Sequence, residues 1–251
     1  MARSDLQDKV ALITGGSRSI GAAIAVELAG RGAKVVVNFV SNATAAKDVV
    51  RVIESNGGTA ISVQADVSEQ SDVVTLIDET VKRFERIDIL VNNAAMQRRQ
   101  PFPNVDPIYF HEMFGTNVLG PIMVTQASLP HFPASGGRII NLSSRVSFSG
   151  GSGDTVYAAT KAAVRRLTRS FAKELGPRNI TVNCVAPGMI ETEGSADLPP
   201  GYRERTLSET PLGRIGQSDD IAAIVGFLAS GESRWLTGRT LLADGGKSDY
   251  W

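Results

Sequence analysis

A tyrosine and a lysine stand one helical turn apart in the segment Val-Tyr-Ala-Ala-Thr-Lys-Ala-Ala-Val. On a helix, Tyr157 and Lys161 would share one face. A nearby ammonium favours the phenolate, so we expect the pKa of this phenol to fall from about 10 towards about 7. Such a group is a general acid and base poised near neutral pH. The spacing alone also fits a helix-face tyrosine beside a solvated lysine.

The position of a serine favours the catalytic interpretation. Ser144 lies 13 residues before Tyr157 and just after the run 138–142, which has the pattern of a buried strand. Doubly wound folds bind their ligands at the carboxyl ends of the strands. This position predicts a ligand site around Ser144 and Tyr157.

A glycine-rich segment, Thr14-Gly-Gly-Ser-Arg-Ser-Ile-Gly21, follows a strand pattern and opens a helix pattern. We call residues 14–21 the glycine loop. Free N–H groups and the positive end of a helix at such a turn can bind the pyrophosphate of a dinucleotide. Gly15 permits the tight turn, and Gly21 permits close packing of helix on sheet. A turn of this kind can also be purely structural.

The elements that must hold these groups are short apolar runs alternating with longer helical patterns. The runs are near-continuously apolar, as in a parallel sheet covered on both faces. Their regular alternation with helices predicts βαβ units and a doubly wound sheet. The predicted strands are residues 10–14, 33–39, 60–64, 87–92, 138–142, 180–185 and 240–243. The predicted helices are residues 20–31, 45–55, 71–83, 109–129, 157–175 and 219–229.

The chain shows no linker, internal repeat or low-complexity tract. We therefore expect a single α/β domain of Rossmann type over residues 1–251, with a mainly parallel seven-stranded sheet and helices on both faces. The stretch 187–214 is rich in Gly, Pro, Ser and charge and is long for an α/β connection. We expect it to be a substrate lid; the alternative is a solvent-exposed excursion without a role.

Together these motifs resemble the classical short-chain dehydrogenase/reductase family over nearly the whole chain. The glycine loop is similar to that family's T-G-x-x-x-G-x-G, with Ser19 in place of the middle glycine. Four further segments resemble the family's motifs in the right order: Asp66-Val67, Asn92-Asn93-Ala94-Ala95, Pro187-Gly188-Met-Ile-Glu-Thr192 and Asp244-Gly245-Gly246. The second of these carries Ala95 where the family has glycine.

The resemblance implies hydride transfer between a nicotinamide and a carbonyl carbon, with Tyr157 protonating the carbonyl oxygen. It implies that Ser144 hydrogen-bonds the same oxygen. Lys161 would lower the phenol pKa and hold the ribose hydroxyls, and Asn117 would position a water that connects Lys161 to solvent. The implied cofactor-binding residues are Gly15, Ser17, Arg18, Ser19, Ile20, Asn38, Ser41, Asp66, Val67, Asn93, Ala94, Ala95, Tyr157, Lys161, Pro187, Gly188, Ile190 and Thr192.

The end of the second predicted strand indicates which cofactor is used. NAD-binding members of the family carry an acidic residue there, which bonds the ribose and would repel a 2′-phosphate. By the family's spacing this position is Phe39, and no acid lies between Lys34 and Ala46. Arg18 could clasp a phosphate, with Asn38 and Ser41 as neutral donors. We expect NADP(H); the alternatives are an NAD-dependent alcohol or sugar dehydrogenase, or a non-catalytic binding protein of the same fold.

Composition limits the other partners. Lys plus Arg equals Asp plus Glu at 26 each, so nothing favours nucleic acid. The longest apolar stretches are too short for a bilayer, and a single cysteine, Cys184, allows no internal disulfide, so we expect a cytoplasmic protein. His111 and His131 lack ligand spacing, and no metal is expected. The family resemblance implies a homotetramer paired through helices 109–129 and 157–175, with the aromatic end 247–251 docked.

The sequence predicts a small-molecule carbonyl or alcohol substrate without naming it. Specificity should lie in residues 96–102, 145–156 and 189–214. Arg98 and Arg99 could touch an acidic substrate, although a solvated loop is the favoured interpretation. Similar enzymes that reduce acyl chains on a carrier protein tend to use two basic docking sites. Arg178 matches one, and the segment 133–136 at the other has no basic residue, so we expect a free ketone, keto ester or sugar.

Overall fold

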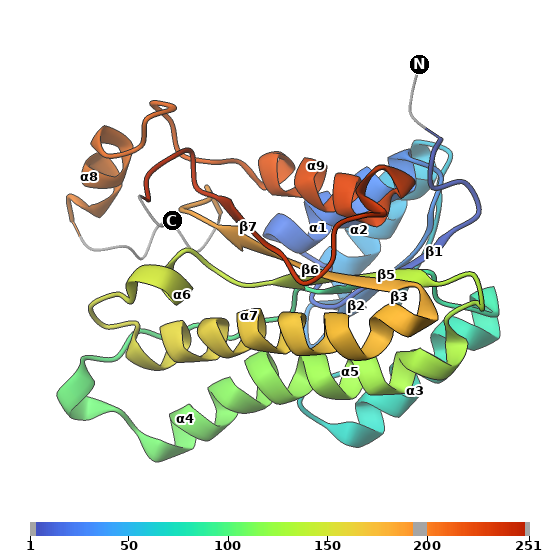
Figure 1. Cartoon of the computed structure of the whole chain (residues 1–251), viewed down its shortest axis with the longest axis horizontal. Helices are drawn as coiled ribbons and strands as arrows, with labels where there is room; N and C mark the ends of the chain where they lie inside the picture. Colours follow the sequence, from blue (N-terminus) through green and yellow to red (C-terminus); the bar gives the residue numbers. More distant parts are fainter. Residues whose placement is uncertain (1–3, 193–199, 249–251) are drawn as a thin grey trace.

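The structure is a computed structural model that describes residues 4–192 and 200–248. Seven strands form one sheet in the order β3-β2-β1-β4-β5-β6-β7, and every pairing is parallel (Figure 1). The doubly wound sheet predicted from the sequence is confirmed, and each predicted strand is present with only its ends shifted. The strands are β1 (Val10–Ile13), β2 (Lys34–Phe39), β3 (Thr59–Gln64), β4 (Ile89–Asn92), β5 (Gly137–Leu142), β6 (Ile180–Pro187) and β7 (Thr240–Ala243).

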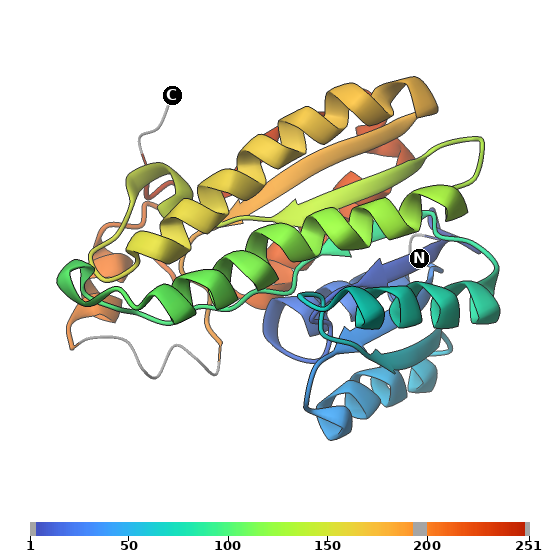
Figure 2. The same ribbon diagram turned by 90° about the horizontal axis from the view of Figure 1, so that it is seen from below.

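Helices cover both faces of this sheet. One layer holds α1 (Ser19–Gly30), α2 (Ala43–Ser55) and α9 (Ser218–Ala229) (Figure 1). The opposite layer holds α3 (Gln70–Phe84), α4 (Pro107–Phe114), α5 (Gly120–Ser128) and α7 (Thr155–Leu175), seen from below in Figure 2. The short helices α6 (Val146–Ser149) and α8 (Tyr202–Ser208) lie together at one end of the molecule, at the left of Figure 1. Single 3₁₀ turns cover Phe102–Asn104, Leu129–His131, Gly176–Arg178 and Gly231–Ser233.

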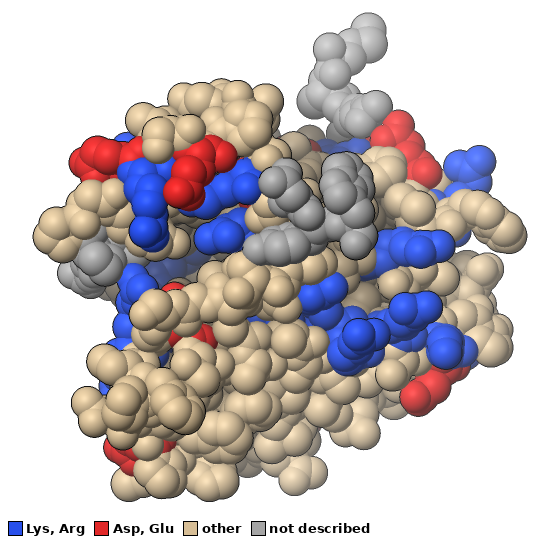
Figure 3. All heavy atoms as spheres, turned by 60° about the vertical axis from the view of Figure 1, so that its left-hand side comes forward, with Lys and Arg blue, Asp and Glu red and all other residues tan. Residues whose placement is uncertain are grey.

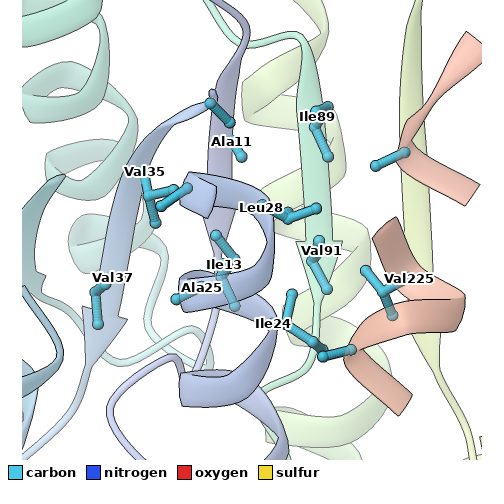
Figure 4. Close-up of a cluster of buried hydrophobic side chains, with 14 of the residues drawn as sticks. Ala11, Ile13, Ile24, Ala25, Leu28, Val35, Val37, Ile89, Val91 and Val225 are labelled. Carbon is cyan, nitrogen blue, oxygen red and sulfur yellow. The ribbon is translucent and has the colours of Figure 1, made fainter. Parts of the chain in front are cut away.

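The strands are mostly apolar because each face of the sheet packs on helices. Alternate residues of β1 face opposite layers: Ala11 and Ile13 belong to the cluster beneath α1, whereas Leu12 belongs to the cluster on the other face. Figure 4 shows the first cluster, in which Ile24 and Leu28 of α1 point onto β1 and β4. This packing fixes the start of α1 at the carboxyl end of β1.

The helix predicted over residues 109–129 is interrupted, and that prediction is wrong in this detail. It forms α4, then a π-helical turn over Gly115–Leu119, then α5. Pro121 has no N–H to donate to the carbonyl of Asn117, four residues earlier, so a regular α-helix loses one hydrogen bond there. A single π turn absorbs the defect, as is frequent at functional sites. Asn117 lies on this turn.

The described part of the stretch 187–214 is more regular than its composition suggested. It includes α8. A short parallel bridge joins Ile190 to Gly216, just beyond the end of the stretch. Residues 193–199 of this stretch, and 249–251 of the end predicted to dock, lie outside the described residues. Within the described ranges, no helix combines the length and the apolar character needed to cross a bilayer, and no group of three or more His, Cys, Asp or Glu is arranged to hold a metal ion.

Candidate active site

The glycine loop crosses the point where the strand order reverses, between β1 and β4. Gly15 adopts a positive φ of 60°, which a glycine takes without strain. A Cβ on Gly21 would lie 2.2 Å from the carbonyl oxygen of Gly15, so the start of α1 touches the turn before it. The tight turn predicted at Gly15 is confirmed, and the close approach at Gly21 is to this turn and to Asn93 after β4.

Ser19 stands where the motif has its middle glycine, and its backbone has a positive φ of 49°. A side chain in this left-handed region costs about 1–2 kcal/mol relative to the right-handed one. The loop therefore keeps the backbone shape that suits glycine and carries a hydroxyl as well. This strain is local to the first residue of α1.

Asn38 of β2 supports the loop from behind, which corrects its expected role as a phosphate donor. The side chain is fully buried. Its Oδ1 accepts from the N–H of Gly15 at 3.1 Å, and its Nδ2 donates to the carbonyls of Val63 (3.4 Å) and Ala65 (2.9 Å). Both amide protons are used inside the fold, so none is left for a ligand.

Asn93, after β4, ties the loop from the other side. Its Nδ2 donates to the carbonyls of Thr14 (2.9 Å) and Gly15 (3.0 Å). The N–H groups of Asn93 and Ala94 both donate to Thr14 Oγ1 at 3.0 Å. The sequence indicated Thr14 only as the first residue of the motif. Its hydroxyl, which connects the end of β1 to the end of β4, was not predicted.

The first turn of α1 is open to an anion. No side chain caps this helix and its first turn has no acidic residue, whereas Asn42 caps α2 and Asp106 caps α4. The free N–H groups of such a turn suit phosphate oxygens. Arg18 precedes the turn and is exposed, and Ser41 is exposed beyond the end of β2. Phe39, at the position that is acidic in NAD-binding members, is buried at 6% exposure.

The remaining residues predicted to bind the cofactor lie at the same sheet edge, at or after the ends of β1, β3, β4 and β6. Asp66 Oδ1 accepts from the N–H (2.9 Å) and the hydroxyl (2.7 Å) of Ser68, and Val67 is buried in the core. Gly188 donates to the carbonyl of Ala243 at 2.8 Å, and a Cβ on it would lie 2.7 Å from the Cβ of Asp244. Ser17, Ile20, Ala95, Pro187, Ile190 and Thr192 complete the predicted set. Chemically, this edge offers free N–H groups, a cation and close backbone approach, which fit a dinucleotide phosphate.

Helix α7 carries Tyr157 and Lys161 under the end of β5. The Nζ of Lys161 lies 5.7 Å from the centre of the Tyr157 ring and donates to the carbonyl of Leu142 at 2.9 Å. Ser144 follows β5, and its Oγ accepts from the N–H of Val146 at 3.4 Å. The structure therefore brings the three predicted side chains together.

Burial sets the protonation of this pair, and one expectation is corrected. Burial raises the pKa of Tyr157 to about 12, against the opposing hydrogen bond with Ser144. Burial also lowers the pKa of Lys161 to about 8. The phenol pKa expected near neutrality is wrong for the protein alone, because loss of water disfavours the phenolate. At neutral pH the pair is a protonated phenol beside an ammonium.

Asn117 reaches the site from the π turn. Its Oδ1 accepts from the N–H of Met96 (2.7 Å), while its Nδ2 donates to the carbonyl of Met96 (2.9 Å) and to Thr160 Oγ1 (3.1 Å). The Thr160 hydroxyl in turn donates to the carbonyl of Tyr157 at 2.8 Å. The side chain of Asn117 thus fastens the segment after β4 to α7. Thr160 was missed because nothing in the sequence pairs it with a residue 43 positions away.

Known proteins resemble this chain along its length. A family model described as "Enoyl-(Acyl carrier protein) reductase" matches residues 15–248. An uncharacterized oxidoreductase of Methylorubrum extorquens is 44% identical over 246 residues, 97% of this chain and 99% of its own. A 3-oxoacyl-[acyl-carrier-protein] reductase of Staphylococcus aureus is 40% identical, with 95% and 97% covered. A short-chain dehydrogenase of Burkholderia cenocepacia, solved in complex with NADP, has a TM-score of 0.90 at 37% identity, with 97% and 99% covered.

Proposed function

Since the chain belongs to the classical short-chain dehydrogenase/reductase family of oxidoreductases, we propose that it reduces a ketone to a secondary alcohol, reversibly, with NADP(H). The observation that carries this proposal is the geometry of the site: Lys161 Nζ lies 5.7 Å from the centre of the Tyr157 ring, and Ser144 follows β5 at the sheet edge that also holds the glycine loop. The names of the relatives support it, since one reduces 3-oxoacyl groups and another was solved with NADP.

In this mechanism NADPH, when bound at the glycine loop, would supply the hydride that the carbonyl carbon accepts. Tyr157 donates its phenolic proton to the carbonyl oxygen, so the C=O group becomes CH–OH. Ser144 donates a hydrogen bond to the same oxygen as negative charge develops on it. Lys161 stabilises the phenolate that remains until solvent returns a proton. A pKa of about 12 keeps Tyr157 protonated at neutral pH, which suits the direction of reduction.

Asn117 serves this reaction as a positioning residue. Its side chain is hydrogen-bonded to Met96 and Thr160. The water that would link Lys161 to solvent would therefore bind the main-chain carbonyl of Asn117. This carbonyl accepts no α-helical hydrogen bond, because residue 121 is proline. The N–H groups of the glycine loop would hold the pyrophosphate, and Arg18 with Ser41 would hold the 2′-phosphate. Asp66 and Val67 would contact the adenine, and the segment 187–192 the carboxamide.

Two features of the whole protein belong to the same proposal. Residues 187–214 act as the substrate lid of a single domain over residues 1–251. The chain forms a homotetramer through α4, α5 and α7, as supported by apolar side chains exposed on and next to α4: Ile108 (69%), Phe110 (37%) and Leu119 (47%). Light scattering at micromolar concentration tests the tetramer, and a monomer would contradict it. The cytoplasm stays the predicted compartment.

Oxidation of NADPH, followed at its absorbance band with a panel of ketones, tests the function. We expect turnover with NADPH, slower turnover with NADH, and severe loss in Lys161→Ala. Binding of NADPH without oxidation across the panel would favour a non-catalytic protein of the same fold. Equal rates with both cofactors would contradict the 2′-phosphate site at Arg18.

A further inference from the structure

A cavity of about 550 Å³ opens at the end of the molecule where α6, the start of α7 and α8 meet. Figure 3 shows Lys and Arg gathered around a hollow at this end, with acidic side chains above it. Four cations line it: Arg99, Arg145, Arg205 and Lys247. We call it the basic cavity. The carboxylates on its wall are Asp154 and Glu209, so the described lining carries more positive than negative charge.

The two carboxylates are already paired. Asp154 lies 3.7 Å from Arg99 and also accepts from Gln97 at 3.2 Å. Glu209 lies 3.0 Å from Lys247. Arg145 and Arg205 make no ion pair with any residue in the described part of the chain. Within the described residues these two guanidinium groups have no salt-bridge partner, and the carboxylate that attracts them, Glu209, is paired with Lys247.

An aromatic ring holds part of this arrangement in place. The guanidinium of Arg99 lies 5.9 Å and that of Arg205 lies 5.6 Å from the centre of the Tyr202 ring. A guanidinium against an aromatic face keeps its edge donors free for a carboxylate or phosphate. Arg205 is thus oriented by packing and still able to bind an anion with two parallel hydrogen bonds.

The basic cavity is lined in part by residues next to the proposed active site in the chain. Arg145 directly follows Ser144 and is anchored by its N–H, which donates to the carbonyl of Pro187 at 2.8 Å. Asp154 is the N-cap of α7, one turn before Tyr157. A substrate whose carbonyl reaches Ser144 and Tyr157 can therefore extend into the cavity. Arg18 lies at the start of α1, so this cavity is distinct from the proposed 2′-phosphate site.

We propose that the substrate is a ketone that carries an anionic group, a carboxylate or a phosphate, which Arg145 and Arg205 bind in the basic cavity. This inference rests on the proposed function, since it names the substrate class of the same site. It narrows the expectation of a free ketone, ester or sugar to a charged ketone. It also gives Arg99 a place on a binding surface, where the sequence favoured a solvated loop. The anionic group is unchanged by the reaction.

The first test compares keto acids with their methyl esters in the holoenzyme. The acids are acetoacetate, 4-oxopentanoate, 5-oxohexanoate and 6-oxoheptanoate, which vary the distance from carbonyl to carboxylate; dihydroxyacetone phosphate supplies the phosphate arm. We expect at least one anion to exceed its neutral counterpart in kcat/KM, mainly through KM. Arg205→Gln and Arg145→Gln should each lower the acid-to-ester ratio about tenfold or more, as expected for lost charged hydrogen bonds. Arg51→Gln, an exposed arginine on α2, should keep the ratio.

The outcomes separate the inference from the proposed function. Reduction of esters and uncharged ketones at the same efficiency as acids, or an unchanged ratio in both arginine variants, would overturn the anion site alone. If no carbonyl oxidises NADPH, the proposed function fails, and calorimetric titration of NADPH-saturated protein with glutarate still decides the site. We expect glutarate to bind the parent and to lose binding in the Arg145→Gln/Arg205→Gln double variant. No binding to the parent would refute the inference.

Discussion

The glycine loop and the basic cavity lie on the same side of the molecule and are built in opposite ways. The loop is shaped by backbone groups and two asparagine side chains, and its ties to β2 and β4 are short hydrogen bonds inside the fold. The cations of the cavity are long side chains from separate segments, of which Arg99 and Arg205 are exposed and Arg145 and Lys247 are partly buried. Buried amides allow one geometry, whereas long cations near the surface keep more rotamer freedom with which to adjust to a ligand. A fixed cofactor suits the first design and a variable substrate the second.

The largest effect on turnover is expected at the proposed active site. Tyr157→Phe removes the proton and keeps the ring, so turnover should fall by about a hundredfold to ten-thousandfold while NADPH affinity stays. Steady-state rates and a fluorescence titration of NADPH measure the two quantities. A rate within tenfold of the parent would show that another group donates the proton.

Gly21→Ala tests how rigid the glycine loop is. The new Cβ would lie 2.2 Å from the Gly15 carbonyl oxygen and 2.6 Å from Asn93 Nδ2. We expect the free energy of unfolding to fall by about 1–3 kcal/mol through overpacking, with NADPH affinity reduced at least about tenfold. Gly30→Ala, in the last turn of the same helix with open space around it, is the matched control and should be neutral or stabilising. Parent-like binding by Gly21→Ala would break the contrast between a fixed and an adaptable region.

Arg18 differs from the rest of the glycine loop, because its side chain is exposed whereas the loop is held by buried groups. The parent should prefer NADPH over NADH by about tenfold to a thousandfold in kcat/KM, or roughly 1.4–4 kcal/mol. Arg18→Ala should weaken use of NADPH far more than use of NADH. Arg51→Ala removes an exposed arginine from α2 and should leave the ratio alone. An unchanged ratio in Arg18→Ala would place the 2′-phosphate elsewhere.

The pH dependence of reduction should follow Lys161 and not Tyr157. The pKa of Lys161 is lowered to about 8, so its charge is lost as pH rises through that value, while Tyr157, with a pKa of about 12, stays protonated. We expect kcat/KM for reduction to decline above pH of about 8, by up to about tenfold per unit. Oxidation of the alcohol needs the phenolate and should rise over the same range. A reduction profile that stays flat from pH 7 to 10 would contradict this assignment.

The smallest effect is expected from relieving strain in the glycine loop. Ser19→Gly removes a side chain from a residue with φ of 49°. Glycine also gains freedom in the unfolded chain, so the net gain in unfolding free energy should be only about 0.5–1 kcal/mol. Thermal denaturation at matched concentration measures it. A loss of stability would mean that the Ser19 hydroxyl forms a stabilising contact that outweighs the strain.

The sheet and its edge could be predicted because they depend on local signals. Continuous apolar runs identify buried parallel strands, and a turn rich in glycine between strand and helix identifies the loop. The π turn could not be predicted from hydrophobic periodicity, because one extra residue leaves the apolar face nearly intact. Its signal was Pro121, which removes one donor from an otherwise regular helix.

The supporting residues of the site were less predictable, because their partners are distant in sequence. Asn38 reads as a polar residue at the end of a strand, and its partners Val63 and Ala65 are 25 and 27 positions away. The basic cavity draws its cations from separate segments around residues 99, 145, 205 and 247. Such sets become visible only when the chain is folded. The phenol pKa was misjudged for the same reason, since burial is a property of the assembled site.

The hydrogen bonds of Asn38 have a consequence for the folding and the lifetime of the protein. The loop acquires its shape only when β1, β2 and β3 have paired, so nucleotide binding becomes possible only after residue 65 has joined the sheet. A ligand that binds the paired state alone stabilises it by mass action. The cellular supply of nucleotide would then govern the lifetime of the protein against proteases as well as its rate. Hydrogen exchange at the Gly15 amide, which donates to Asn38 Oδ1, should slow in step with nucleotide concentration.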